Sequence, residues 1–327
     1  MIEPQRLRAT GEFLLAQPRL RLLLHKHPDG DVLGSCLGLA RFLAGRGADV
    51  AVFGPYECSA KFDFLAGYGE IQNGREEARN PRFADTLYVV VDSTGVDRTG
   101  FQEGDFQRLL RIDHHIGGSD YDPHDLKDTS YGATALLIAD LVRSLDEAAI
   151  DAPLATCLYT GLMTDTGGFR YTNTDAHVFR SASFLVERGA DPSAIAAFVH
   201  DRRSPIYLEL MRRALASLEY HEDRRVAVIT LTPDGLPPEA SVLFGEDDFI
   251  NLPRSLAGVE VVVQFKLALD GEWKVGFRGK GRVNVQAIAQ ALGGGGHFSA
   301  SGCELRGDVD EVKSRVLKQV RSALHSL

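Results

Sequence analysis

The sequence predicts an α/β protein in which a parallel sheet with flanking helices is joined by a helical connector to a smaller α+β domain. Over the first half, short apolar runs alternate with helix-like stretches, which is typical of parallel strands buried on both faces. After about residue 220 the pattern changes to strands that follow one another closely. With 327 residues, the chain is also longer than one hydrophobic core usually supports.

Apolar periodicity places the individual elements. Strands of the first half are predicted within 21–25, 49–53, 87–92 and 109–115. Helices are predicted at 33–45, 131–145, 152–164, 174–189 and 204–218, separated by Gly, Pro and Asp breakers. The later part contains strand patterns at 225–231, 259–269 and 272–279 and helical patterns at 288–292 and about 308 to 326. We therefore predict domains at 1–190 and 219–327, with a connector at 191–218.

The composition limits the classes of protein to consider. A content of 44% hydrophobic and 25% charged residues is ordinary for a globular chain. No apolar run approaches the roughly 20 residues that cross a bilayer, and no signal-peptide core is present, so we expect a cytoplasmic protein without membrane contact. The net charge of -9 disfavours long nucleic acids, including long duplexes, unless a local basic groove compensates, and favours a small anionic substrate.

The cysteines give no sign of a disulfide framework or of a thiolate metal site, because they are widely scattered without a CxxC pair. We expect all four to be buried packing residues: Cys36, Cys58, Cys157 and Cys303.

Three apolar runs of the first half end in side chains that bind metal ions. The first reaches His25 and is followed by Asp29 and Asp31, the second ends at Asp92, and the third leads to His114. Parallel sheets collect their ligands at the carboxyl ends of strands, so we expect these groups to converge. A single Asp after a strand is more often a turn residue or a helix cap. Three such strand ends together favour a cluster.

A fourth carboxylate is expected at Asp165, where a predicted helix gives way to a loop containing Gly167 and Gly168. Closely packed carboxylates repel one another and protonate unless cations neutralise them. Four Asp and at least two His side chains therefore predict divalent ions. Imidazole and carboxylate ligands without thiolate suit Mn²⁺ above all, with Mg²⁺, Co²⁺ and Zn²⁺ as alternatives.

Four segments carry a resemblance to a known family. They are HKHPDGDVLGS at 25–35, VVVDSTG at 89–95, IDHH at 112–115 and TDTGGFRYTNT at 164–174. In this order they resemble the motifs of the DHH phosphoesterase superfamily, and the similarity covers most of the first 180 residues. The first domain is accordingly expected to be the catalytic, metal-binding one.

The resemblance implies a role for each candidate ligand. It implies that one ion is bound by His25 and Asp29, a second by Asp31, His114 and Asp165, and that Asp92 bridges the two. It also implies that His115 faces the phosphoryl group while Asp113 supports its neighbours, so that His115, Asp113 and Asp92 are the expected catalytic residues. The implied reaction is attack of a metal-bound hydroxide on phosphorus.

The second domain carries a basic segment with Lys274, Arg278, Lys280 and Arg282, and then a run of four glycines, 293–296. Taken singly, the first is typical of a solvated strand edge, and the second is equally typical of a flexible loop or of a phosphate-binding backbone. Residues 277–302 resemble the DHH-associated C-terminal domain of the bacterial nanoRNase and pAp phosphatase family. The resemblance implies substrate contacts from Arg278, Gly295, Gly296 and His297, to which we add Lys280 as a candidate.

The predicted activity is exoribonuclease-type hydrolysis of short oligoribonucleotides (nanoRNA) and of 3′-phosphoadenosine 5′-phosphate (pAp), or alternatively of cyclic or linear dinucleotides. A manganese pyrophosphatase is disfavoured by the glycine run, and a RecJ-type exonuclease is disfavoured by the chain length. A nucleotide-binding regulator with an idle metal site is disfavoured because all six ligand positions are intact. A homodimer is expected from base rates alone.

Overall fold

The computed structural model describes residues 1–54, 58–73, 85–236, 248–268 and 270–325. They belong to two compact units, Met1–Arg202 and Arg203–Leu327. The segment predicted as a connector is divided between these units. Helix α7 (Pro192–His200) buries Ile195 and Val199 in the core of the first unit, whereas α8 (Pro205–Ala216) buries Tyr207 and Leu210 against strand β8 of the second.

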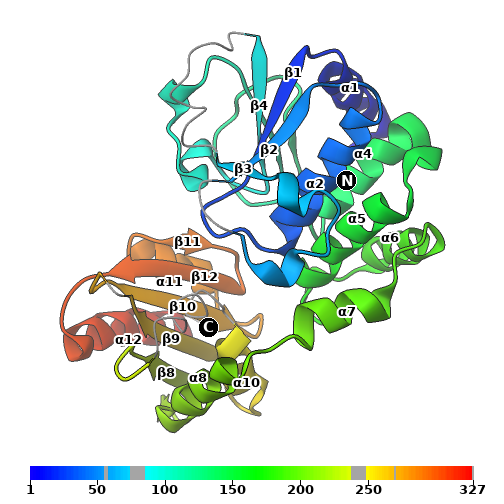
Figure 1. Cartoon of the computed structure of the whole chain (residues 1–327). Helices are drawn as coiled ribbons and strands as arrows, with labels where there is room; N and C mark the ends of the chain where they lie inside the picture. Colours follow the sequence, from blue (N-terminus) through cyan, green and yellow to red (C-terminus); the bar gives the residue numbers. More distant parts are fainter. Residues whose placement is uncertain (55–57, 74–84, 237–247, 269, 326–327) are drawn as a thin grey trace. The chain divides into compact units, whose positions relative to one another are not determined.

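The sheet of the first unit has six strands, all parallel, in the order β3-β2-β1-β4-β5-β6 (Figure 1). Its members are β1 (Arg19–Leu23), β2 (Val50–Gly54), β3 (Gln72–Asn73), β4 (Thr86–Val91), β5 (Leu109–Asp113) and β6 (Leu126–Lys127). The direction of winding reverses between β1 and β4. The carboxyl ends of these two strands therefore flank the crevice in which α/β proteins bind their ligands.

Helices cover one face of this sheet (Figure 1). They are α1 (Pro4–Leu15), α2 (Gly30–Ala44), α4 (Thr134–Asp146), α5 (Ala152–Asp165), α6 (Ala176–Glu187) and α7. The opposite face of the sheet is buried too. Among the described residues, a segment with short 3-10 helices covers it, and Val96 and Phe101 of this segment pack on Phe53 and Val90 of the sheet. The prediction of strands buried on both faces is confirmed, although described α-helices supply only one of the two layers.

The second unit contains a mixed six-stranded sheet in the order β11-β12-β10-β9-β8-β7, in which only β8 and β9 are parallel. The strands are β7 (Glu219–His221), β8 (Val226–Leu231), β9 (Val261–Leu267), β10 (Trp273–Gly279), β11 (Gly295–Gly296) and β12 (Ala300–Leu305). Helices α11 (Val285–Ala291) and α12 (Val309–His325) share a core with one face of this sheet. Helix α8 packs on the other face of the sheet. The side chains of Phe249 and Ile250, which directly precede the short helix α10 (Asn251–Ser255), pack on the same face.

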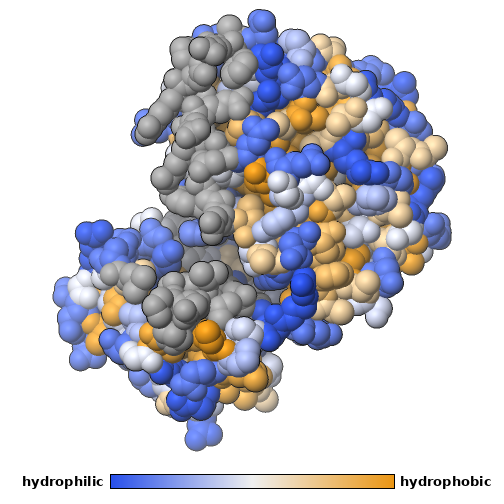
Figure 2. All heavy atoms as spheres, viewed as in Figure 1, coloured by the Kyte–Doolittle hydropathy of each residue, from blue (hydrophilic) through white to orange (hydrophobic). Residues whose placement is uncertain are grey.

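No helix within the described ranges is long and apolar enough to cross a membrane. Over the helical layer of the first unit, hydrophobic residues are interspersed with hydrophilic ones on the face shown in Figure 2. All four cysteines are free thiols: Cys36, Cys157 and Cys303 are buried as predicted, but Cys58 is partly exposed.

Candidate metal centre

The candidate ligands of the first unit converge at the carboxyl ends of its central strands. His25 follows β1, Asp92 follows β4, and His114 follows β5. The Nε2 atom of His25 lies 3.8 Å from Oδ2 of Asp92, and Nε2 of His114 lies 3.6 Å from Oδ1 of the same carboxylate. Asp92 therefore stands between these two imidazoles, and Nδ1 of His115 also lies 3.6 Å from its Oδ1.

The predicted metal ligands form two sets that share Asp92, and a third group around the same carboxylate contains Asp113 and His115. One set is His25, Asp29 and Asp92, and the other is Asp31, Asp92 and His114, with the ligand atoms of each set within 4.8 Å of one another. Asp165 adds to the second set, since its Oδ2 lies 3.6 Å from Nε2 of His114. Two ligands on one ion at about 2.1 Å are themselves roughly 3.0 to 3.5 Å apart, so each set could close on a single ion with small adjustments. The family resemblance implies the same division between two ions, which stays a prediction.

Asp92 has an unusual backbone. Its φ of 54° lies in the left-handed region, where a residue other than glycine carries strain of about 1 to 3 kcal/mol. Two hydrogen bonds hold it there: its N–H donates to the carbonyl of Ile112 at 2.9 Å, and its Oδ1 accepts from the hydroxyl of Thr134 at 2.7 Å. The strained turn places the carboxylate between the two imidazoles.

The start of α4 fixes a second carboxylate. Asp31 is almost fully buried, and its two oxygens accept the backbone N–H groups of Thr134 at 2.7 Å and Ala135 at 2.8 Å. These donors belong to the first turn of a helix, where the helix dipole favours negative charge. Asp29 is held similarly, because as the N-cap of α2 it accepts the N–H groups of Asp31 and Val32.

Close packing of α2 on α5 brings Asp165 to this cluster. A Cβ atom added at Gly34 would lie 2.2 Å from the carbonyl oxygen of Cys157, and one at Gly30 would lie 2.4 Å from the hydroxyl of Thr164. The helices therefore touch backbone to backbone, which only glycine permits. As a result, the end of α5 with Asp165 reaches the start of α2.

Hydrogen bonds link a buried series of side chains next to the ligands. Asp113 and Arg111 are both fully buried, and the Arg111 guanidinium donates two hydrogen bonds to Oδ2 of Asp113, the one from Nε at 3.1 Å. The other oxygen of Asp113 receives the backbone N–H of His115 at 3.1 Å and faces its Nδ1 at 2.7 Å. Asp113 thus orients the His115 ring, and its catalytic role stays a prediction.

The predicted substrate residues of the second unit lie around its glycine segment. Gly295 and Gly296 form β11, paired with β12, so this part of the glycine run is a strand. Arg278 lies at the end of β10, and Lys280 just after it donates to the carbonyl of Leu256 at 2.5 Å. The predicted basic patch is partly neutralised, because Arg282 lies 3.7 Å from Glu260. The role of these residues and of His297 in substrate binding stays a prediction.

Comparison with known proteins gives the family. Residues 20–162 match the DHH family, N-terminal domain, and residues 247–326 match the DHHA1 domain. The chain is 32% identical to the bifunctional oligoribonuclease and PAP phosphatase NrnA of Thermus thermophilus, an alignment covering 98% of this chain and 95% of that protein. The chain belongs to the DHH family. It is also 25% identical to the cyclic-di-AMP phosphodiesterase GdpP of Bacillus subtilis, covering 94% of this chain but 48% of that protein.

Among solved structures, an exopolyphosphatase-related protein from Bacteroides fragilis has a TM-score of 0.85 at 25% identity and covers the whole of this chain. The DHH match ends at residue 162, three positions before Asp165. Five of the six candidate ligands therefore lie inside the matched domain, and the sixth follows directly on the same helix.

The charges of this DHH centre perturb one another strongly. Burial and the neighbouring Asp92 and Asp165 raise the pKa of Asp31 well above its usual value. Burial also raises the pKa of Asp165 to about 6. Burial opposes protonation of His114, but the charges of Asp165, Asp92 and Asp31 outweigh it and raise the pKa of His114 to about 9. For Asp92, burial is outweighed by the hydrogen bond and charges of the surrounding histidines, so its pKa is lowered. Without cations, such a cluster compensates its negative charge with protons.

Several residues of the site lie outside the sequence patterns that predicted the ligands. Thr134 and Ala135 supply donors, Arg111 supplies a buried cation, and the amide of Asn173 donates to Oδ2 of Asp165 at 3.3 Å. The one usable signal was the spacing of Gly30, Gly34 and Gly38, because glycines at every fourth position of a helix mark a close helix contact.

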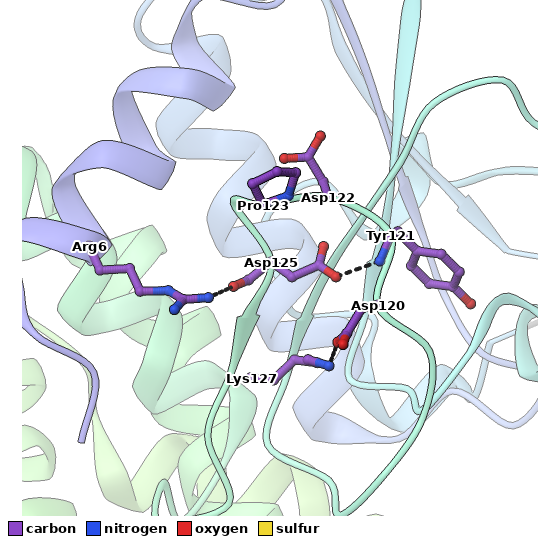
Figure 3. A pocket seen from close by; sticks show the side chains of 7 residues that line it. All are labelled: Arg6, Asp120, Tyr121, Asp122, Pro123, Asp125 and Lys127. Carbon is purple, nitrogen blue, oxygen red and sulfur yellow. Dashed lines mark hydrogen bonds and ion pairs between the residues drawn. The ribbon is translucent and has the colours of Figure 1, made fainter.

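A separate hollow of about 520 Å³ borders the loop between β5 and β6, and residues from α1, this loop and β6 line it (Figure 3). Its lining includes none of the candidate ligands. Asp125 lies at its centre, and its carboxylate accepts the N–H of Tyr121 at 2.8 Å and, on the other oxygen, the N–H of Arg111 at 2.7 Å. The guanidinium of Arg6 donates to the backbone carbonyl of Asp125 at 2.8 Å. The hollow therefore belongs to the frame that fixes β5.

Proposed function

We propose that this chain is a two-metal phosphoesterase that hydrolyses short oligoribonucleotides and 3′-phosphoadenosine 5′-phosphate. The observation that carries the proposal is that two histidine-containing ligand sets share the carboxylate of Asp92. The nearly full-length similarity to an oligoribonuclease and PAP phosphatase supports the class of substrate.

In this proposal each ligand set would hold one divalent ion, Mn²⁺ being the first candidate, and Asp92 would be a ligand of both. When bound, such a pair of ions activates a water molecule for attack on phosphorus and stabilises charge on the phosphoryl oxygens. Asp113 holds His115 in a fixed orientation beside the centre, where His115 meets the phosphoryl group. The two N–H groups at the start of α4 hold the carboxylate of Asp31 in position.

The second unit would bind the remainder of the substrate through Arg278, Lys280, Gly295, Gly296 and His297. Backbone N–H groups of glycines approach phosphates closely, and Arg and Lys match phosphate charge. A cytoplasmic location and a homodimer stay predictions.

Hydrolysis of cyclic or linear dinucleotides is the second candidate function. The similarity to a cyclic-di-AMP phosphodiesterase favours it, although this chain spans only 48% of that relative. The chemistry at phosphorus would be the same.

The test is hydrolysis by the full chain with Mn²⁺, comparing pAp, di- to pentaribonucleotides, cyclic di-AMP, pyrophosphate and a long single-stranded RNA. Asp92→Asn serves as the inactive variant, and Asp201→Asn, which changes an exposed aspartate of the same unit, serves as its matched control. Turnover of pAp and short RNA by the wild type and by Asp201→Asn alone supports the proposal. Activity confined to pyrophosphate or to long RNA, or full activity of Asp92→Asn, contradicts it.

A further inference from the structure

A row of glycines crosses the sheet of the second unit. The strand register pairs Gln264 of β9 with Gly276 of β10, Gly276 with Gly302 of β12, and Gly302 with Gly295 of β11. Paired residues of neighbouring strands point to the same face, so three adjacent strands carry no side chain along this row. At a strand spacing of about 4.8 Å, the three glycines form a flat floor roughly 10 Å long.

The floor lies on the face opposite the α11 and α12 core, because Val275 and Phe277, which flank Gly276 in sequence, point into that core. All three glycines are partly exposed. A Cβ atom added at Gly295 would meet nothing within 4 Å, and one at Gly302 would meet only the Val275 carbonyl of the sheet itself, at 3.1 Å. The floor is therefore open over β11 and β12.

Gln264 closes the other end of the row together with Ile250, whose Cδ1 would lie 3.8 Å from a Cβ atom at Gly276. The Gln264 side chain is 1% exposed, and its Oε1 accepts no hydrogen bond from the described residues. A buried acceptor without a donor destabilises a fold. This acceptor lies at the end of the floor, and because it is buried, a ligand that carries a donor would meet it after a shift of a covering side chain such as Ile250.

The same face presents cations on both sides of the row. Lys274 stands two residues before Gly276 on β10, and Arg278 stands two residues after it. The flat floor fits a planar ring, and the amide at its end fits a polar ring edge. The cations at its sides fit a phosphate attached to that ring.

We propose that this glycine row is a nucleobase subsite, with the Gln264 amide hydrogen-bonding the edge of the base. The inference rests on the proposed function and deepens it. A phosphate group cannot satisfy Oε1 of Gln264, since at neutral pH it offers little but acceptors, whereas the exocyclic amine of a base is a donor. A glutamine amide pairs with both the amine and the adjacent ring nitrogen of adenine, which makes adenine the best fit.

The test is Gln264→Met in the full chain, which keeps the side-chain length and removes the amide. We expect the KM for pAp to rise about tenfold, as for one lost amide–base pair, with kcat little changed. The KM for ribose 3,5-bisphosphate, which lacks the base, should stay unchanged. The melting temperature should stay the same or rise, because no unsatisfied acceptor remains buried. Gln290→Met changes an exposed glutamine of the same unit and is the matched control.

Gly295→Val supplies a second test, since its side chain would stand on the open floor without meeting protein atoms. It should raise the KM for pAp selectively, whereas Gly104→Val, at an equally open glycine of the first unit, should not. Lower stability of Gln264→Met with unchanged KM for both substrates would overturn the subsite, as would equal losses on both. If the wild type hydrolyses no nucleotide, the proposed function fails. The subsite is then decided by calorimetric titration of adenosine 5′-monophosphate: weaker binding to Gln264→Met supports it, and equal binding overturns it.

Discussion

Replacing Arg111 with methionine should destabilise the first unit strongly. The Arg111 side chain is fully buried, and its guanidinium donates to Asp113 through two nitrogens and to the carbonyl of Ser119 at 3.1 Å. Methionine fills much of the same volume but leaves the Asp113 carboxylate buried without its cation. Removing one partner of a buried ion pair costs about 3 to 5 kcal/mol. Because His115 still donates to Asp113, we expect a loss of about 3 kcal/mol.

The loss can be measured by urea denaturation of the wild type, Arg111→Met, Asp113→Asn and the double variant. Residues that share a buried pair are coupled, so the double variant should lose about 1 to 3 kcal/mol less than the sum of the single losses. Arg8→Met is the control, because the exposed pair of Arg8 with Glu12 is worth about 0.5 kcal/mol. Arg111→Met should also lower kcat, since His115 loses its fixed support.

A loss below about 1 kcal/mol for Arg111→Met, additive with that of Asp113→Asn, would refute this reasoning. It would mean that Asp113 finds other donors or is neutral in the folded protein.

Three further predictions concern the metal centre. Asp92→Asn should abolish Mn²⁺-dependent hydrolysis and also lower the ion-free melting temperature, because the surrounding histidines stabilise the charge of Asp92 and lower its pKa. A fully active variant would contradict the shared-ligand assignment. Gly34→Ala should lower the free energy of unfolding by about 1 to 3 kcal/mol, since its Cβ would lie 2.2 Å from a backbone carbonyl. It should also weaken Mn²⁺ binding measured by titration. Gly38→Ala should lower the free energy of unfolding less, because its Cβ meets leucine side chains at 3.1 Å. Equal effects of the two would count against the helix contact as the cause. Without ions, protonation of His114 stabilises the fold fully below its ordinary pKa of 6.5, and this stability is lost as the pH rises to its folded-state pKa of about 9. Protonation of Asp165 likewise stabilises the fold fully below 3.8, and this stability is lost as the pH rises to about 6. The ion-free melting temperature should therefore fall as pH rises through these ranges, and added Mn²⁺ should raise it most near pH 9; a flat profile would argue against the buried cluster.

The sequence predicted the ligand cluster because the relevant information is local. His25, Asp92 and His114 each follow a short apolar run, and parallel strands bring their carboxyl ends to one edge by geometry alone. The strand and helix positions followed from periodicity in the same way. The predicted division of the ligands between two ions rests on the family resemblance, since spacing does not show which oxygen meets which imidazole.

Tertiary contacts set the parts that the sequence did not predict. The donors to Asp31 come from residues about a hundred positions later, at the start of α4, and no local pattern links them. Arg111 is a charged residue in a strand whose other residues are mostly buried, and the buried carboxylate of Asp113 beside it explains its place. The segment predicted as a connector contains two helices whose apolar faces belong to different cores, a division that helical periodicity alone does not reveal.

The order of the elements along the chain also bears on how the protein is made. All six candidate ligands lie between residues 25 and 165, within the unit that ends at Arg202. Domains generally fold as units, and the N-terminal one folds first during synthesis. The centre can therefore assemble before the second unit has folded. We expect the first ligand that the nascent protein meets to be a cation and not a nucleotide, so that scarcity of ions would impair its maturation before it impairs its catalysis.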